Sequence, residues 1–332
     1  MRSLFDLCSG FVYSQVLLAC TRLNLFELVS ASPRSPADIA ANLKLPQQSI
    51  DRLLEAAQSL ELLEARANDQ IGLGPLGAAL LGNPAVAMMI EHHSALYADL
   101  SDPVALLRER HGATELGRYW AYSKNADDNS LDCDQTAGYS ALMAASQQMI
   151  ADQVLSAYSF SRHRRLLDVG GGAGAFAVAA LKQNPELEAQ VFDLPSVAEL
   201  ATQRFDTQGV AERAIAVGGN FLDDPLPEGF DAISVVRILH DHDDDAVMTL
   251  LRGVRQAIPP HGTLLIAEPM LGTPGAERVT AAYFGFYLMA MGQGRARAPD
   301  EITRMLGQAG FGRIKMHRTT APLLVRVISA RP

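Results

Sequence analysis

Hydrophobic and polar residues follow two different periods along this chain. In the first half, apolar residues recur every three or four positions, which is the spacing of helices. Helices are predicted at 11–28, from Ser35-Pro36 onward and at 49–60, and residues 62–73 are predicted to form a short β-hairpin. The order helix, turn, helix, hairpin is typical of a winged helix. The apolar face of 11–28 is broad enough to need a partner, either the rest of the chain or a second subunit.

In the second half, short apolar runs alternate with helical stretches, which favours a mostly parallel sheet covered by helices. The first five predicted strands end near Val169, Asp193, Val217, Leu239 and Ala267. The last two, at 312–317 and 323–330, are separated by only a few residues, so they are expected to pair antiparallel. We predict an α/β fold: a doubly wound, Rossmann-like sheet with an antiparallel C-terminal hairpin, the variant typical of methyltransferases. A nicotinamide-binding Rossmann sheet would be expected to continue parallel.

One stretch, LLDVGGGAGAF at 166–176, joins a buried strand to a helix through three consecutive glycines. Glycine lets the backbone turn tightly and approach a ligand, and the start of a helix offers N–H groups and a partial positive charge. A nucleotide-type cofactor site is therefore indicated. Gly170, Gly172 and Ala175 also fit the dinucleotide fingerprint. Asp168, however, would repel a pyrophosphate, whereas it suits the ammonium group of S-adenosylmethionine (SAM).

A second acid, Asp193, ends the next predicted strand. An acid at this place can accept hydrogen bonds from both ribose hydroxyls of a nucleoside. The alternative is that Asp193 only caps the helix ahead of Pro195. Taken with Asp168, the pair is interpreted as a SAM site.

In sheets of this kind, ligands bind at the carboxyl ends of the strands, so four strand ends are expected to face one crevice. They carry Asp168, Asp193, His240-Asp241 and Glu268. His240 is the residue among them that can act as a general base near neutral pH, and Glu268 could hold its imidazole in the right tautomer. The alternative is that His240 only packs. The run HDHDDD at 240–245 predicts no metal site, because successive side chains diverge and acids at a helix start act as caps.

Charge and cysteine content narrow the function classes. The formal net charge of −9 disfavours nucleic acid or an anionic membrane as an electrostatic partner. The presumed recognition helix carries one base, Arg52, against two acids, which also disfavours DNA binding. Cys8, Cys20 and Cys133 show no metal or disulfide spacing and fit a reducing compartment. Neither a signal peptide nor an apolar run of roughly 18 residues is expected, so we predict a cytoplasmic protein without a transmembrane segment.

Five motifs in order resemble those of the winged-helix small-molecule O-methyltransferases: LLDVGGGAGAF, VFDLP, GGNFLDDPLP, RILHDHDDD and LLIAEPM. That family includes plant caffeate and flavonoid enzymes and bacterial phenazine and polyketide relatives, and the resemblance covers nearly the whole chain. It implies SAM as cofactor and an N-terminal module that mediates homodimerisation rather than DNA binding. Together with the reasoning above, it gives the predicted cofactor-binding set: Asp168, Gly170, Gly172, Asp193, Leu194, Asn220, Phe221 and Arg237.

The resemblance also implies that His240 is the catalytic base and that Glu268 orients it, and we add the neighbouring Asp241 as a third catalytic candidate. Two departures from the family pattern matter. The family often has Asp where this chain has Asn220. A second acidic partner of the base is expected within GQGRARAPDE, where this chain has Ala296. Orientation of the base would then rest on Glu268 alone, or on a residue that the sequence does not locate.

On this basis the chain is divided into three parts. Residues 1–95 are predicted to form the winged-helix dimerisation domain. Residues 96–155 are predicted to be a helical connection that contributes to the substrate pocket. Residues 156–332 are predicted to form the SAM-binding methyltransferase domain.

Other stretches, among them YSALMAASQ, AEPMLGTPGAE and AAYFGFYLMAMGQGRAR, resemble the acyclic carotenoid branch of the family. These are the demethylspheroidene or hydroxyneurosporene O-methyltransferases of purple phototrophs, which methylate a tertiary 1-hydroxyl. The uncharged run 281–291 independently favours a hydrophobic substrate, although a buried helix is also apolar all round. Peripheral membrane contact would help to reach such a substrate. The predicted substrate-pocket residues are Met143, Tyr283, Phe286, Tyr287 and Met291.

Three alternatives stay open. The first is the same chemistry on an aromatic, polyketide or phenazine hydroxyl, which pocket polarity would distinguish. The second is an NAD-dependent oxidoreductase, which would be protected from thermal unfolding by NAD rather than SAM. The third is a winged-helix regulator with a vestigial cofactor domain, which would bind DNA at low salt.

Overall fold

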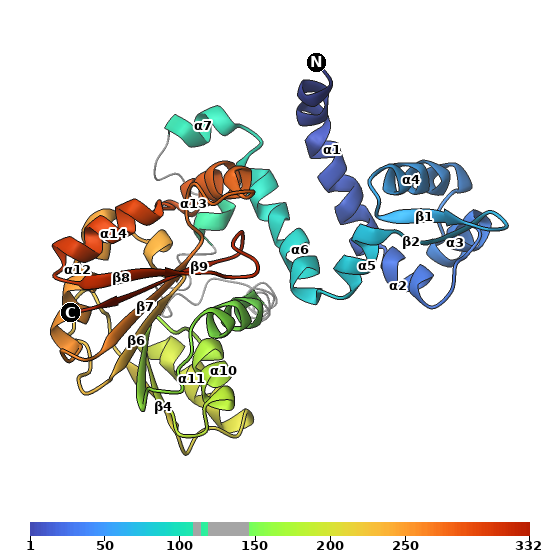
Figure 1. The fold of residues 1–332 in the computed structure, drawn as a ribbon. Helices are drawn as coiled ribbons and strands as arrows, with labels where there is room; N and C mark the ends of the chain where they lie inside the picture. Colours follow the sequence, from blue (N-terminus) through green and yellow to red (C-terminus); the bar gives the residue numbers. More distant parts are fainter. Residues whose placement is uncertain (109–113, 119–145) are drawn as a thin grey trace. The chain divides into compact units, whose positions relative to one another are not determined.

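The computed structural model describes residues 1–108, 114–118 and 146–332. The chain forms two compact units, 1–94 and 95–332, each with its own core (Figure 1). The helix α6 (Pro84–Asp99) contains the boundary between them. The separate helical connection expected at 96–155 stays a prediction, because much of it lies outside the described residues.

The N-terminal unit is a helical bundle with one small hairpin. Its elements before α6 are α1 (Arg2–Arg22), α2 (Leu25–Ser30), α3 (Pro36–Leu43), α4 (Gln47–Ser59), β1 (Leu63–Arg66), β2 (Gln70–Leu73) and α5 (Pro75–Leu81). The hairpin β1–β2 pairs antiparallel, as predicted. The single helix expected at 11–28 is wrong. The observed helix begins earlier and ends at Arg22, because Asn24 takes a left-handed conformation (φ 50°), which asparagine tolerates better than most residues.

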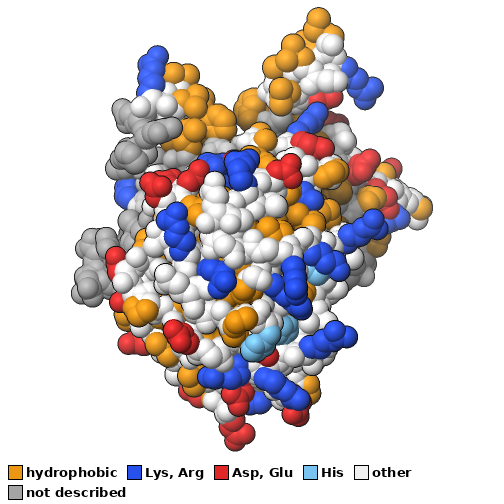
Figure 2. Space-filling model, turned by 60° about the vertical axis from the view of Figure 1, so that its left-hand side comes forward, with side chains coloured by type: hydrophobic (Ala, Val, Ile, Leu, Met, Phe, Trp, Pro, Cys, Tyr) orange, Lys and Arg blue, Asp and Glu red, His pale blue; other side chains and the backbone are white. Residues whose placement is uncertain are grey.

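The free end of α1 exposes large apolar side chains. Figure 2 shows hydrophobic side chains gathered along this end of α1, at the top of the view. They are Met1, Leu4, Phe5, Leu7, Phe11, Val12 and Tyr13. By length and composition alone α1 could cross a membrane. A helix that packs against protein passes the same test, so the result does not by itself indicate a membrane span.

The C-terminal unit is built on a seven-stranded sheet within the described residues, in the order β5-β4-β3-β6-β7-β9-β8. The strands are β3 (Arg165–Val169), β4 (Glu188–Asp193), β5 (Ala214–Gly218), β6 (Ala232–Val236), β7 (Thr263–Glu268), β8 (Gly312–His317) and β9 (Arg326–Arg331). The first five pair parallel, and β9 pairs antiparallel with both β7 and β8. The predicted sheet with its antiparallel C-terminal hairpin is confirmed.

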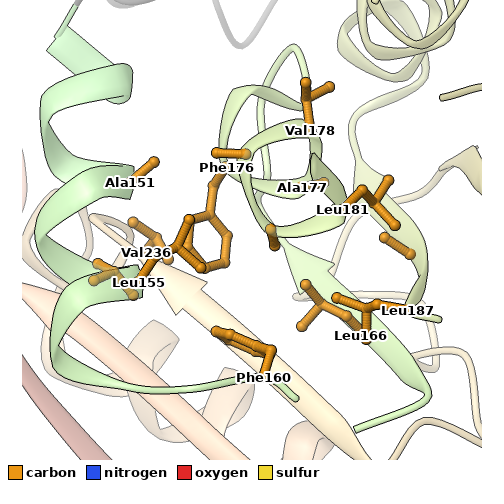
Figure 3. Close-up of a cluster of buried hydrophobic side chains, with 14 of the residues drawn as sticks. Ala151, Leu155, Phe160, Leu166, Phe176, Ala177, Val178, Leu181, Leu187 and Val236 are labelled. Carbon is orange, nitrogen blue, oxygen red and sulfur yellow. The ribbon is translucent and has the colours of Figure 1, made fainter. Parts of the chain in front are cut away.

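Helices cover both faces of this sheet. The described helices and short turns of the unit are α7 (Pro103–Arg108), the helix 146–157, α10 (Ala175–Gln183), α11 (Pro195–Thr207), η1 (Leu239–Asp241), α12 (Asp244–Ala257), η2 (Val279–Tyr283), α13 (Phe284–Met291) and α14 (Pro299–Gln308). One core cluster joins the helix 146–157 and α10 to β3 and β6. Figure 3 shows Phe160 and Phe176 meeting there. A second cluster buries α12 and α14 on the other face.

The chain reverses its direction of travel across the sheet at β3. It proceeds from β3 to β4 and β5 on one side, then returns to β6 and β7 on the other. In doubly wound sheets ligands bind at this reversal, at the carboxyl ends of the strands. The glycine-rich loop after β3 and the η1 turn after β6 therefore lie at adjacent strand ends.

Candidate functional site

The loop after β3 needs glycine at its first position. Gly170 has φ +68°, and a Cβ there would lie 2.5 Å from Cδ1 of Ile238. Side chains rarely adopt this conformation, and no space is left for one. The loop therefore packs closely against the segment that leads from β6 to η1.

Asp168 lies on β3, directly beneath this loop, and is buried. Its Oδ1 accepts a 2.6 Å hydrogen bond from the hydroxyl of Ser234, which is its register partner on β6. Among the described residues, its Oδ2 is the buried side-chain atom without a hydrogen-bond partner. Burial raises the pKa of this carboxyl to about 7, against the opposing effect of the Ser234 hydrogen bond. An orphaned buried acid of this kind fits a cationic ligand group.

Asp193 ends β4 and holds the glycine-rich loop. Its Oδ2 accepts a 2.8 Å hydrogen bond from the backbone N–H of Gly172, and its Oδ1 accepts a 2.7 Å bond from that of Leu194. Burial raises the pKa of Asp193, and these two bonds oppose that effect. The structure thus brings Asp193, Gly172 and Leu194 together, and gives Asp193 a loop-anchoring role that the sequence did not reveal.

Asn220 and Phe221 follow β5 in a tight turn. The amide of Asn220 donates to Asp223 (2.6 Å) and accepts from the N–H of Leu222 (3.0 Å), so it stabilises this turn. The ring of Phe221 meets His242 edge-on, with centroids 5.3 Å apart. Phe221 therefore connects the turn after β5 to the segment that carries His240.

His240 lies in η1 and is buried between two acids. Its Nδ1 is 2.6 Å from Oε2 of Glu268, and its Nε2 is 3.2 Å from Oδ1 of Asp241. A carboxylate can only accept, so the short contact fits Nδ1–H donating to Glu268, and Nε2 is the ring nitrogen that takes up and releases a proton, next to Asp241. Burial lowers the pKa of His240, but the charges of Asp241 and Glu268 outweigh it, so this pKa lies above the ordinary histidine value.

Glu268 also holds the backbone of the turn. Glu268 lies at the end of β7, and its Oε1 accepts hydrogen bonds from the N–H groups of Ile238 (2.9 Å) and Leu239 (2.7 Å). The same carboxyl group therefore fixes both the turn and the imidazole of His240. The sequence predicted the partner but not the two backbone contacts.

Arg237 ends the predicted strand earlier than expected. The strand β6 stops at Val236, because Arg237 has φ 57° and turns the chain toward η1. Its N–H donates to the carbonyl of Ala267 (2.8 Å). Its positive charge opposes the rise in pKa of both His240 and Tyr283. A strained non-glycine backbone of this kind is often found at functional sites.

An apolar cluster lies beside the base. The ring of Phe284 meets His240 edge-on at 6.1 Å. The cluster contains the predicted pocket residues Tyr283, Phe286, Tyr287 and Met291, together with leucines from α6 and α7. Burial raises the pKa of Tyr283 to about 12. The remaining pocket candidate, Met143, lies outside the described residues.

Two residues of this region carry almost no signal in the sequence. Ser234 was hidden in the apolar run AISVV, where a lone serine is a weak signal, and only strand register places it against Asp168. Arg297 is buried against η1 and lies 58 residues along the chain from Leu239, whose carbonyl it contacts, so no local pattern links the two. No group of three or more His, Cys, Asp or Glu residues in the described part is arranged to hold a metal ion.

Comparisons with known proteins agree with this arrangement. Residues 97–312 match the O-methyltransferase domain, and residues 5–82 match the O-methyltransferase dimerisation domain. The chain is 42% identical over 329 residues to demethylspheroidene O-methyltransferase of Cereibacter sphaeroides, covering 98% of this chain and 86% of that protein. It is 39% identical over 328 residues to the protein of the same name in Rhodobacter capsulatus, covering 99% and 81%.

A solved structure shows the same fold over the whole length. Human N-acetylserotonin methyltransferase in complex with SAM matches with a TM-score of 0.79 and 26% identity, covering 99% of this chain and 96% of that one. The domain match covers well over half of the chain, and the sequence relatives span nearly all of it. This protein belongs to the O-methyltransferase family.

Proposed function

We propose that this protein transfers the methyl group of SAM to a hydroxyl of a hydrophobic small molecule, with His240 as general base. The observation that carries the proposal is the His240 imidazole. It is held through Nδ1 by Glu268 at 2.6 Å and lies beside an apolar cluster. Family membership supports the reaction class.

The residues of the glycine-rich end fit SAM. The orphaned Oδ2 of Asp168 suits an ammonium group, and the loop from Gly170 to Gly172 lets the backbone approach a ligand. Asp193 retains acceptor capacity for ribose hydroxyls, since each carboxylate oxygen can accept a second hydrogen bond. When bound, SAM supplies an electrophilic methyl group.

His240 would move the proton. Its Nε2 would accept the hydroxyl proton of the substrate, while the methyl group that SAM supplies leaves its sulfur for the substrate oxygen and S-adenosylhomocysteine remains. The resulting imidazolium is stabilised by Glu268 at Nδ1 and by Asp241 at Nε2. Arg237 keeps positive charge near the same imidazole and so favours release of the proton afterwards.

An acyclic carotenoid bearing a 1-hydroxyl is the proposed substrate. Two relatives that cover nearly the whole chain carry the name demethylspheroidene O-methyltransferase. The apolar cluster next to His240 supports a hydrocarbon ligand. Its tyrosine and phenylalanine rings would also accept an aromatic hydroxyl compound, the second candidate.

The test is mass spectrometry of products after incubation with SAM, an acyclic hydroxycarotenoid, and a panel of phenols and phenazines. We expect the carotenoid to gain one methyl group on oxygen. Methylation of a phenol alone would move the substrate to the aromatic class. No transfer to any hydroxyl compound, with NAD rather than SAM raising the melting temperature, would contradict the proposal.

The N-terminal unit is proposed to form a homodimer. The exposed apolar residues of α1 extend into the dimerisation-domain match at 5–82, which favours a second copy over a bilayer as their partner. Light scattering should give a dimer for the full chain and a monomer for Phe5→Glu/Phe11→Glu. Leu200→Glu, an exposed apolar position on α11, is the matched control and should stay dimeric. A monodisperse monomer of the unmodified chain at micromolar concentration would overturn the idea.

A further inference from the structure

The turn η1, which carries His240, is held from two opposite sides. Glu268 accepts the N–H groups of Ile238 and Leu239 at its start. On the other side, Arg297 donates to the carbonyls of Leu239 (2.5 Å) and His242 (2.8 Å), which bracket His240 and Asp241. We infer that Arg297 is a positioning residue for the base, an inference that rests on the proposed function.

The guanidinium of Arg297 is buried and makes further hydrogen bonds besides those to the turn. The residue is 2% exposed. Its Nε and Nη2 donate to Asp244 (3.0 and 2.6 Å), and Nη1 also reaches the carbonyl of Arg295 (3.3 Å). With the two turn carbonyls, this engages all five N–H donors of a guanidinium. Lysine, with one nitrogen, cannot span two carbonyls in this geometry.

The segment around Arg297 follows the same surface of the turn. Gln293 donates to the carbonyl of Asp241 (3.0 Å). At Gly294 (φ +81°) a Cβ would collide with the carbonyl oxygen of His240, so glycine is required for this close approach. Residues 292–298 begin directly after α13, the helix of the apolar cluster, and therefore join that helix to the turn of the base.

Positioning by Arg297 is important in this chain because Ala296 stands where a second acid would orient the base. The family resemblance led us to expect a second acid there to orient the base, and the structure shows a buried alanine instead. Within the described residues, orientation falls to Glu268 and Asp241 at the imidazole and to Arg297 at the backbone. A displacement of about 1 Å at a catalytic group can cost on the order of 100-fold in rate.

The test compares Arg297→Met, Arg297→Lys and Arg295→Met in the full chain. Arg295 is the matched control: it shares Asp244 with Arg297, but its side-chain hydrogen bonds within the described residues go to Asp244 and Glu301 and not to the turn carbonyls. Arg297→Met should lower kcat about 10- to 100-fold, leave the SAM dissociation constant within about twofold, and move the acid limb of the kcat–pH profile downward. Arg297→Lys should recover part of kcat, and Arg295→Met should retain nearly all of it.

The position of the acid limb of the kcat–pH profile distinguishes a positioning role of Arg297 from a purely structural one. If Arg297 holds His240 against its acids, its loss weakens the charges that raise the pKa of His240, and the limb shifts. A purely structural role lowers the melting temperature and leaves the limb in place, which would overturn the inference, as would normal kcat in Arg297→Met. If Arg297→Met does not fold, Arg297→Lys serves instead: its smaller loss of kcat should still come with a downward shift of the limb, and an unshifted limb would overturn the inference. Absence of methyl transfer by the unmodified protein would count against the proposed function instead.

Discussion

The two halves of the site are built in different ways. The cofactor half consists of neighbours in sequence: Asp168, the glycines, and Asp193 at the end of the next strand. In the base half, the three-residue turn η1 is held by Glu268 and Arg297, two residues that lie at least 28 positions further along the chain than the turn residues they contact. Local backbone geometry thus suffices for one half, whereas the other depends on tertiary packing.

This difference predicts separable defects, and the largest is at the base. His240→Ala should lower turnover by roughly 10²–10⁴-fold, the usual contribution of a general base. SAM affinity should stay nearly unchanged, because the contacts of Asp168 and Asp193 are not touched. Single-turnover kinetics and calorimetry would measure the two effects, with the exposed His261→Ala as control. A large loss of SAM affinity in His240→Ala would show that the two halves are not separable.

The next effect concerns the cofactor half. Asp193→Ala should weaken SAM binding by about 1.5–3 kcal/mol, the scale of hydrogen bonds to a charged group. Loss of the Gly172 contact adds loop disorder to the loss of a ribose acceptor. Calorimetry with Glu199→Ala, an exposed acid on α11, as control would measure it. Unchanged affinity would remove Asp193 from the site.

The smallest effect is at Ser234. Ser234→Ala removes a hydrogen bond to a carboxyl that is largely protonated at pH 6, so the folded chain should lose about 0.5–1.5 kcal/mol there. The pKa of Asp168 is raised to about 7 in the folded chain, so the cofactor-free protein should lose stability as pH rises from about 4 to about 7. Ser234→Ala should extend that loss to higher pH.

Melting temperatures measured from pH 5 to 9 would test this. Thr273→Ala, which removes a buried hydroxyl whose partner is the backbone carbonyl of Met270, is the matched control and should leave the pH dependence unchanged. Identical pH dependence in Ser234→Ala and the unmodified protein would show that Ser234 does not influence Asp168.

The same contrast explains how far the sequence could be interpreted. The glycine loop, the alternation of strands and helices, and the C-terminal hairpin are local patterns, and the structure confirms them. The predicted strand β6 is three residues too long, because no residue type in this segment indicates that Arg237 has a positive φ and ends the strand. The partnerships of Ser234 and Arg297 depend on register and on a crossing of distant segments, which periodicity does not contain.

The pH dependence of methyl transfer tests the central claim most directly. His240 must be neutral to take a proton. Its pKa lies above 6.5, the ordinary histidine value, because the charges of Asp241 and Glu268 outweigh the effect of burial. Activity of the unmodified protein should therefore fall as pH drops through a limb above about 6.5. The residual activity of His240→Ala should lack this limb. The same limb in both proteins would contradict the assignment of His240 as the base.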